Sequence, residues 1–157
     1  MPVNFVPLFV AGRAEAMVID VPNSSTEPGT GVILFSQNLP RTDNQLWELR
    51  LTGEHDAAHP PNPFVFIINK HSGMALTVPS RPRFDQGAAV VQEPLHNGAN
   101  QKWLQFSPPS QPGKFVFASD WSGGLVIAVK GSNFSNGTPI IQEPETDQPN
   151  QLWQTSD

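Results

Sequence analysis

Four-residue strings of the form Asn-Gln-x-Trp decide the fold of this chain, and they occur three times. They are Asn44-Gln45-Leu46-Trp47, Asn100-Gln101-Lys102-Trp103 and Asn150-Gln151-Leu152-Trp153. The tryptophans lie about fifty residues apart, so each string closes roughly one third of the 157-residue chain. Self-similarity at a fixed spacing indicates a repeat architecture, in which a single unit cannot bury its hydrophobic surface alone.

The similarity between the repeats continues upstream of each string. A glycine with paired apolar residues three and four positions later begins the segments 29–35, 87–93 and 137–143. Repeats two and three also share Gln-Glu-Pro, whereas repeat one carries two extra residues between this segment and its tryptophan. The three units are therefore in register with one another.

Each repeat also contains two short apolar runs separated by a turn. The pairs are 5–10 with 17–21, 64–69 with 74–78, and 115–119 with 125–129. Runs rich in Val, Ile and Phe between Gly, Pro, Asn and Ser predict strands joined by hairpins. No stretch keeps a 3.6-residue period, so we expect helices of single turns at most. The sequence predicts one all-β domain over 1–157, with twelve strands in repeats at approximately 1–52, 53–107 and 108–157.

The composition restricts the class of partner. The formal net charge is −5, whereas proteins that bind nucleic acid present a basic face, so no nucleic-acid partner is expected. The absence of cysteine excludes a disulfide framework and a thiol nucleophile. The apolar N-terminus lacks a basic n-region, and no apolar run is long enough for membrane insertion. We expect a protein that is cytoplasmic or released without a classical signal peptide.

The three in-register Gln-x-Trp repeats resemble the ricin-B-type, or R-type, lectins, a family of β-trefoils, over essentially the whole chain. The lack of cysteine makes the chain most similar to fungal lectins of this family. The resemblance implies a β-trefoil, in which the three units close into a barrel with a hairpin cap. It also implies a lectin for terminal galactose or N-acetylgalactosamine glycans.

The tryptophan and the glutamine of each string are expected mainly to stabilise the fold. Tryptophan buries up to roughly 250 Å², so the three tryptophans are expected to fill one layer of the barrel core. A glutamine can tie its strand to a neighbouring backbone through both ends of its amide. We therefore expect the three glutamines to act mainly as scaffold.

A hexose site needs polar groups that grip hydroxyls and a ring that stacks on the C–H face. The resemblance implies an Asp ending the second strand, an aromatic residue on the third, and the Asn before Gln-x-Trp. Repeat one has all of them, and the predicted carbohydrate-binding residues are Asp20, Phe35, Asn44 and Gln45. Aspartate is poorly suited to an apolar strand, so its presence there favours a site. The alternative is that Asp20 is a solvated strand-end acid and Phe35 a core residue.

The other two repeats look degenerate at these positions. The corresponding residues are Thr77, Glu93 and Asn100 in repeat two, and Ala128, Glu143 and Asn150 in repeat three. Neither repeat has a carboxylate at the first position or a ring at the second. The segment His96-Asn97-Gly98 could add polar contacts in repeat two, although such clusters usually form turns.

The sequence is also compatible with two further functions: a β-trefoil protease inhibitor acting through an exposed loop, 53–63 or 107–113, and a trefoil that only mediates assembly. The turn residue Trp121 could be a sugar platform, a dimer contact or a cap on the barrel. No catalytic residue, metal ligand or cofactor is predicted, because the acids are scattered over turns and no nucleophile motif occurs. Cross-linking of cells would require a homodimer, which no sequence feature demonstrates.

Overall fold

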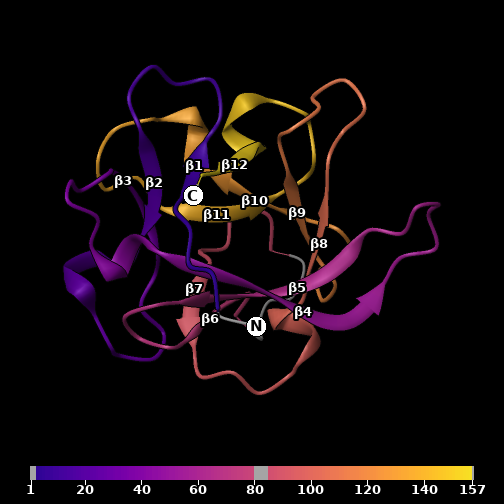
Figure 1. The fold of residues 1–157 in the computed structure, drawn as a ribbon, viewed down its shortest axis with the longest axis horizontal. Coiled ribbons are helices and arrows are strands. Elements are labelled where there is room, and N and C mark those ends of the chain that lie inside the picture. The colour runs from indigo at the N-terminus through magenta and orange to yellow at the C-terminus, as the bar shows by residue number, and fades with distance from the viewer. Residues whose placement is uncertain (1–2, 80–84, 157) are drawn as a thin grey trace.

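The structure is a computed structural model that describes residues 3–79 and 85–156 (Figure 1). Its strands are β1 (Leu8–Val10), β2 (Met17–Asp20), β3 (Ile33–Ser36), β4 (Trp47–His55), β5 (Pro63–Asn69), β6 (Ala75–Thr77), β7 (Val91–Glu93), β8 (Trp103–Phe106), β9 (Val116–Ser119), β10 (Val126–Val129), β11 (Ile140–Glu143) and β12 (Trp153–Thr155). Five single-turn 3-10 helices complete the described part: η1 (Pro22–Ser24), η2 (Asp43–Gln45), η3 (Ala99–Gln101), η4 (Lys130–Ser132) and η5 (Pro149–Gln151). These elements confirm the all-β prediction.

Six of the strands close a barrel. Antiparallel pairs β4–β5, β8–β9 and β12–β1 join one repeat to the next. Within each repeat the first strand meets the fourth, through the bridge Val6–Trp47, the pair β5–β8 and the bridge Phe115–Trp153. A ring in which each strand has two neighbours removes most exposed sheet edges.

The other six strands form three hairpins at one end of the barrel. They are β2–β3, β6–β7 and β10–β11. Isolated bridges connect each hairpin to the other two, at Gly31–Val91, Ile33–Pro139 and Ala89–Ile141. An isolated two-stranded hairpin is marginal in water, so mutual contact and packing on the barrel stabilise all three.

The three tryptophans lie in the main core and are fully buried. Each indole also needs a partner for its N–H. Trp47 Nε1 donates to the Ile19 carbonyl (3.0 Å), Trp103 Nε1 to Leu76 (3.0 Å) and Trp153 Nε1 to Ile127 (3.2 Å). Burial of the aromatic ring and a bond to the second strand thus recur in every repeat.

The three glutamines make an equally regular set of bonds, as expected for scaffold residues. Each Oε1 accepts from a backbone N–H: Asn38 to Gln45 (2.8 Å), His96 to Gln101 (2.9 Å) and Thr146 to Gln151 (2.7 Å). Each Nε2 donates to a carbonyl, of Ser36 (3.0 Å), Pro94 (2.9 Å) and Pro144 (2.8 Å) respectively. The amide therefore fixes the segment that follows the third strand in each repeat.

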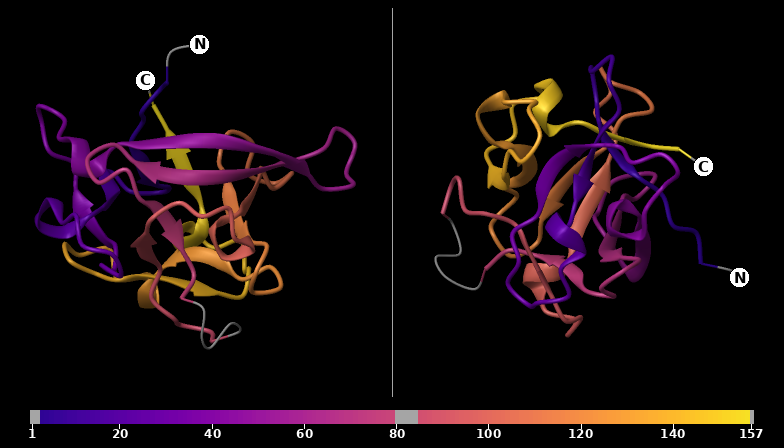
Figure 2. Two further views of the ribbon diagram at one scale, coloured as in Figure 1. Left: turned by 90° about the horizontal axis from the view of Figure 1, so that it is seen from below. Right: turned by 90° about the vertical axis from the view of Figure 1, so that its left-hand side faces the viewer.

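The segment 53–63, which the sequence predicts as an exposed loop, contains the end of one strand and the start of the next. β4 continues to His55, which pairs with Pro63, and the long β4–β5 hairpin extends beyond the barrel (Figure 2). The turn is confined to 56–62, because the Asp56 carboxylate accepts from the backbone N–H groups of Ala58 (3.1 Å) and Asn62 (2.8 Å). A side-chain acceptor that caps its own turn lets the flanking strands run further.

Candidate functional site

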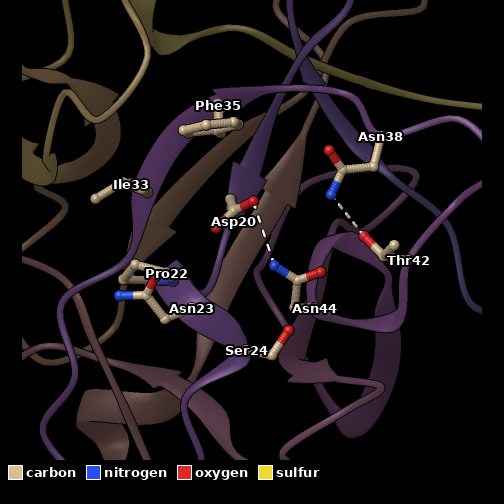
Figure 3. A pocket seen from close by; sticks show the side chains of 9 residues that line it. All are labelled: Asp20, Pro22, Asn23, Ser24, Ile33, Phe35, Asn38, Thr42 and Asn44. Atoms are coloured by element: carbon tan, nitrogen blue, oxygen red, sulfur yellow. Dashed lines mark hydrogen bonds between the residues drawn. The ribbon is translucent and has the colours of Figure 1, made fainter.

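The structure brings three of the four predicted sugar-binding residues to one cavity of about 310 Å³ in repeat one (Figure 3). Asp20 lies at its centre. Pro22, Ile33 and Phe35 form an apolar wall, whereas Asn38, Thr42 and Asn44 lie on the opposite, polar side. A cavity with one apolar and one polar side around an acid suits a ligand that has both kinds of surface.

Asp20 occupies the centre because β2 ends there, paired with Ile33 of β3. Its side chain is buried, at 5% exposure, and its Oδ2 accepts from Gln45 Nε2 (2.8 Å) and Asn44 Nδ2 (3.3 Å). Burial raises the pKa of Asp20, and the bonds from Gln45 and then Asn44 oppose that rise. The two amides thus orient one carboxylate oxygen and leave Oδ1 without a hydrogen bond from the described residues.

Asn44 and Gln45 reach Asp20 because both lie on η2, immediately before the buried Trp47. Asn44 Nδ2 also donates to the Val21 carbonyl (3.1 Å), which holds the end of β2 against η2. Gln45 is fully buried and does not line the cavity. Its place in the structure is behind Asp20, as a residue that positions the carboxylate.

Phe35 lies on β3 opposite Val18, and its half-buried ring borders the cavity. The alternative interpretation, a solvated Asp20 with a core Phe35, is wrong on both points. Asp20 is buried, and Phe35 does not belong to the buried core. The strand alternation places each side chain where a ligand could meet it.

Asn38 and Thr42, on the polar side of the cavity, were not predicted from the sequence. Asn38 Nδ2 donates to Thr42 Oγ1 (2.8 Å), and both residues line the cavity. They belong to the segment between β3 and Trp47, in which repeat one is two residues longer than the other repeats. The two extra residues are the sequence feature that could have indicated a different cavity wall in repeat one.

Repeat two also has a cavity, of about 290 Å³, lined by Thr77, Pro79, Glu93, His96 and Asn100. The position of Asp20 is taken by Thr77, whose Oγ1 accepts from Gln101 Nε2 (3.2 Å). The position of Phe35 is taken by Glu93. This cavity therefore has a different chemistry from the first.

Repeat three places a carboxylate against the same pair of amides. Glu143 Oε2 accepts from Gln151 Nε2 (2.7 Å) and Asn150 Nδ2 (3.3 Å). Glu143 comes from the third strand, at the position equivalent to Phe35, because Ala128 on the second strand has no polar group. Repeat three thus retains the acid but not the ring.

Trp121 is half-buried and packs against the main core. Within the described residues, no three His, Cys, Asp or Glu side chains lie close enough together to hold a metal ion. No helix in residues 3–79 and 85–156 is long and apolar enough to span a membrane.

Comparison with known families identifies this arrangement. The sequence matches the model of the ricin-type beta-trefoil lectin domain-like family over residues 43–143. The chain belongs to the ricin-type β-trefoil lectin family. No protein of curated function matches this family member significantly over its sequence.

Solved structures of the same fold cover the family member almost completely. The designed threefold-symmetric protein ThreeFoil has 27% sequence identity and a TM-score of 0.82, covering 98% of each chain. The Rhizoctonia solani agglutinin has 22% identity and a TM-score of 0.78, covering 100% of this chain and 96% of its own. The Macrolepiota procera ricin B-like lectin, in complex with lactose, has 15% identity and a TM-score of 0.76, covering 99% and 96%. These likenesses confirm the β-trefoil fold and the similarity to fungal ricin B-like lectins.

Proposed function

We propose that this lectin-family chain binds glycans ending in galactose or N-acetylgalactosamine through the repeat-one cavity, without catalysis. The observation that carries the proposal is the buried Asp20 carboxylate, oriented by two amides and facing a cavity bordered by an aromatic ring. The lactose bound by the Macrolepiota procera lectin, a disaccharide that contains galactose, supports the choice of sugar.

The proposed roles follow from the position of each group. Asp20 accepts hydrogen bonds from two neighbouring hydroxyls, and such charge-assisted bonds are roughly twice as strong as neutral ones. Phe35 stacks on the C–H face of the sugar, and Asn44 makes a polar contact beside Asp20. Gln45 holds the carboxylate in place from behind, so its effect on the sugar is indirect.

Binding rather than hydrolysis is proposed because the cavity contains one carboxylate. A glycosidase of the common type needs two, on either side of the scissile bond. Among the described residues that line the repeat-one cavity, Asp20 is the single acid. One such cavity in a chain also means that agglutination of cells through this site requires a homodimer.

A glycan array followed by calorimetry tests the proposal. The wild-type chain should bind galactose- or N-acetylgalactosamine-terminated glycans, and Asp20→Asn should weaken binding about a hundredfold by removing a charged acceptor. Phe35→Ala should weaken it about tenfold through the lost stacking. Asp43→Asn is the matched control, because Asp43 lies beside Asn44 on η2 but outside the cavity.

The absence of binding to every galactose-terminated glycan on the array would reject the sugar assignment. Unchanged affinity of folded Asp20→Asn protein, measured beside Asp43→Asn, would instead reject the site. The two failures are separable, because the first concerns the ligand and the second its location.

A protease inhibitor is the second candidate, and the β4–β5 hairpin is the feature that favours it. Its turn protrudes from the barrel (Figure 2), and Asp56 holds it with bonds to the backbone and to Asn62 Nδ2 (2.9 Å). A preorganised, exposed turn is what a protease-binding loop requires. Inhibition assays with serine and cysteine proteases, with and without galactose, would distinguish this function from lectin activity.

A further inference from the structure

The repeat-two cavity has a set of free polar groups that differs from that of repeat one. Among the described residues, its lining of Thr77, Pro79, Glu93, His96 and Asn100 contains no ring of Phe, Tyr or Trp. Its volume of about 290 Å³ is at the small end of the range for small-molecule sites, which suits a single sugar ring. Without an aromatic platform, recognition there depends on hydrogen bonds and charge.

Some of these groups are already occupied. The Thr77 hydroxyl donates to the Ala75 carbonyl (2.9 Å) and accepts from Gln101 Nε2 (3.2 Å). Asn100 Nδ2 donates one of its two hydrogens to the Val78 carbonyl (2.9 Å), and its Oδ1 accepts no hydrogen bond from the described residues. Glu93 makes no hydrogen bond or ion pair with the described residues. Two acceptors, one of them charged, are therefore open to a ligand.

His96 supplies the matching donor. Its ring Nδ1 accepts the backbone N–H of Gly98 (3.0 Å), so the neutral imidazole carries its hydrogen on Nε2. Its backbone N–H is bound to Gln101 Oε1 (2.9 Å), which ties the residue to the Gln-x-Trp scaffold. The ring is thus held in one orientation and one tautomer.

The positions of His96 and Asn100 also depend on the lack of a side chain at Gly98. Its φ of −71° is open to any residue, yet a Cβ there would lie 2.4 Å from His96 Cε1 and 2.8 Å from Asn100 Oδ1. A side chain there would displace the imidazole of His96 or the amide of Asn100 from its present position. The glycine therefore allows the imidazole and the amide to lie together beside the cavity.

The two carboxylates of the first and second cavities differ in how well they are compensated. Asp20 is buried and accepts two amide hydrogen bonds, whereas Glu93 is half-buried and accepts none from the described residues. An uncompensated carboxylate gains most from a positively charged donor, because a charge-assisted hydrogen bond is roughly twice as strong as a neutral one. A ligand with an ammonium group and nearby hydroxyls satisfies Glu93, Asn100 and His96 together.

We propose that repeat two is a second site, which binds hexosamines with a free ammonium group in preference to neutral hexoses. The ammonium group donates to Glu93 and Asn100 Oδ1, and a ligand hydroxyl accepts from His96 Nε2–H. This site does not depend on the galactose site of repeat one, because the two cavities share no lining residue in the part of the chain that the structure describes. The chain would then carry two sites of different selectivity.

Calorimetry at pH 7 on the Asp20→Asn variant tests the proposal with the first site silenced. Glucosamine should bind at least about tenfold more tightly than glucose or N-acetylglucosamine, which lack the ammonium group. Added Glu93→Gln should remove that preference, whereas Glu145→Gln, the same change at an exposed residue outside the cavity, should preserve it. Gly98→Ala should also weaken glucosamine binding, with thermal unfolding used to confirm that each variant is folded.

Equal binding of glucosamine and glucose, or no binding of either, would overturn the proposal. Unchanged glucosamine affinity in folded Glu93→Gln protein would overturn it as well. These outcomes are independent of the galactose assignment, which is measured on the wild-type chain with different ligands and with Asp20→Asn.

Discussion

Repeats one and three hold a carboxylate oxygen against the same pair of amides, but they take it from different strands. In repeat one the oxygen belongs to Asp20 of β2, 2.8 Å from the glutamine Nε2 and 3.3 Å from the asparagine Nδ2. In repeat three it belongs to Glu143 of β11, at 2.7 and 3.3 Å. In both repeats the buried amides need a hydrogen-bond acceptor. The third strand of the repeat supplies it where the second strand does not.

This difference explains how a repeat can keep its scaffold and lose its sugar-site pattern. Glu143 occupies the position at which repeat one has Phe35, so the residue that satisfies the amides replaces the stacking ring. One side chain cannot be both acceptor and platform. Repeat two is a third solution, because Thr77 accepts from the glutamine and leaves Glu93 free of that task. The amides of the repeated string thus require only a hydrogen-bond acceptor, whereas a sugar site of the repeat-one type also requires an aromatic ring.

The largest expected effect tests whether the scaffold is truly equivalent in the two repeats. Trp47→Ala and Trp153→Ala should each lower the free energy of unfolding by about 3–5 kcal/mol, the usual cost of truncating a buried aromatic residue. Both indoles are fully buried and donate to a backbone carbonyl, so the losses should be similar. Urea unfolding measures them. A loss at Trp153 less than half of that at Trp47 would show that the repeats are not equivalent.

A graft tests whether two residues separate repeat three from repeat one. The double variant Ala128→Asp, Glu143→Phe should raise the number of galactose molecules bound by calorimetry from one to two, because it restores both the acid and the ring. Ala128→Asp alone is the control. It brings a second carboxylate to amides that Glu143 already occupies, so it should lower stability by about 1–3 kcal/mol without adding a site. A double variant that folds and still binds one galactose would show that the longer 37–42 segment of repeat one is also needed.

The smallest expected effect is the contribution of Asp20 to the pH dependence of the free energy of unfolding. Burial raises the pKa of Asp20, so ionisation costs the folded state more than the unfolded state. The stability that the protonated acid contributes is complete below its unfolded pKa and is lost as the pH rises through the folded value. The free energy of unfolding of wild type should therefore fall relative to Asp20→Asn as the pH rises above about 4.

Asp56→Asn should give the opposite pH dependence and serves as the internal control. Hydrogen bonds from Asn62 lower the pKa of Asp56, so its contribution is present at neutral pH and is lost as the pH falls. Urea unfolding at a series of pH values compares the two variants with wild type. The same sign of pH dependence in both would contradict the contrast between a buried and a turn-capping carboxylate.

The residues of the candidate site were partly readable from the sequence. Asp20, Phe35 and Asn44 could be named because the resemblance to ricin-B-type lectins implies those positions relative to the repeated pattern, and the structure brings them to one cavity. Asn38 and Thr42 could not, because they belong to a segment that the repeats do not share. The role of Glu143 was also hidden, because its contact with Asn150 and Gln151 of η5 is not visible in the spacing of residues along the third strand.

By itself the sequence determined the all-β architecture, because strand length, turn residues and a buried tryptophan in every repeat are local features that recur at a readable spacing. Only the tertiary structure decided which side chains satisfy the buried amides, that Trp121 packs on the core, and that Gly98 makes room for His96. These outcomes depend on contacts between residues on different strands or folded back across a turn. Distances in space, rather than positions along the chain, determine them.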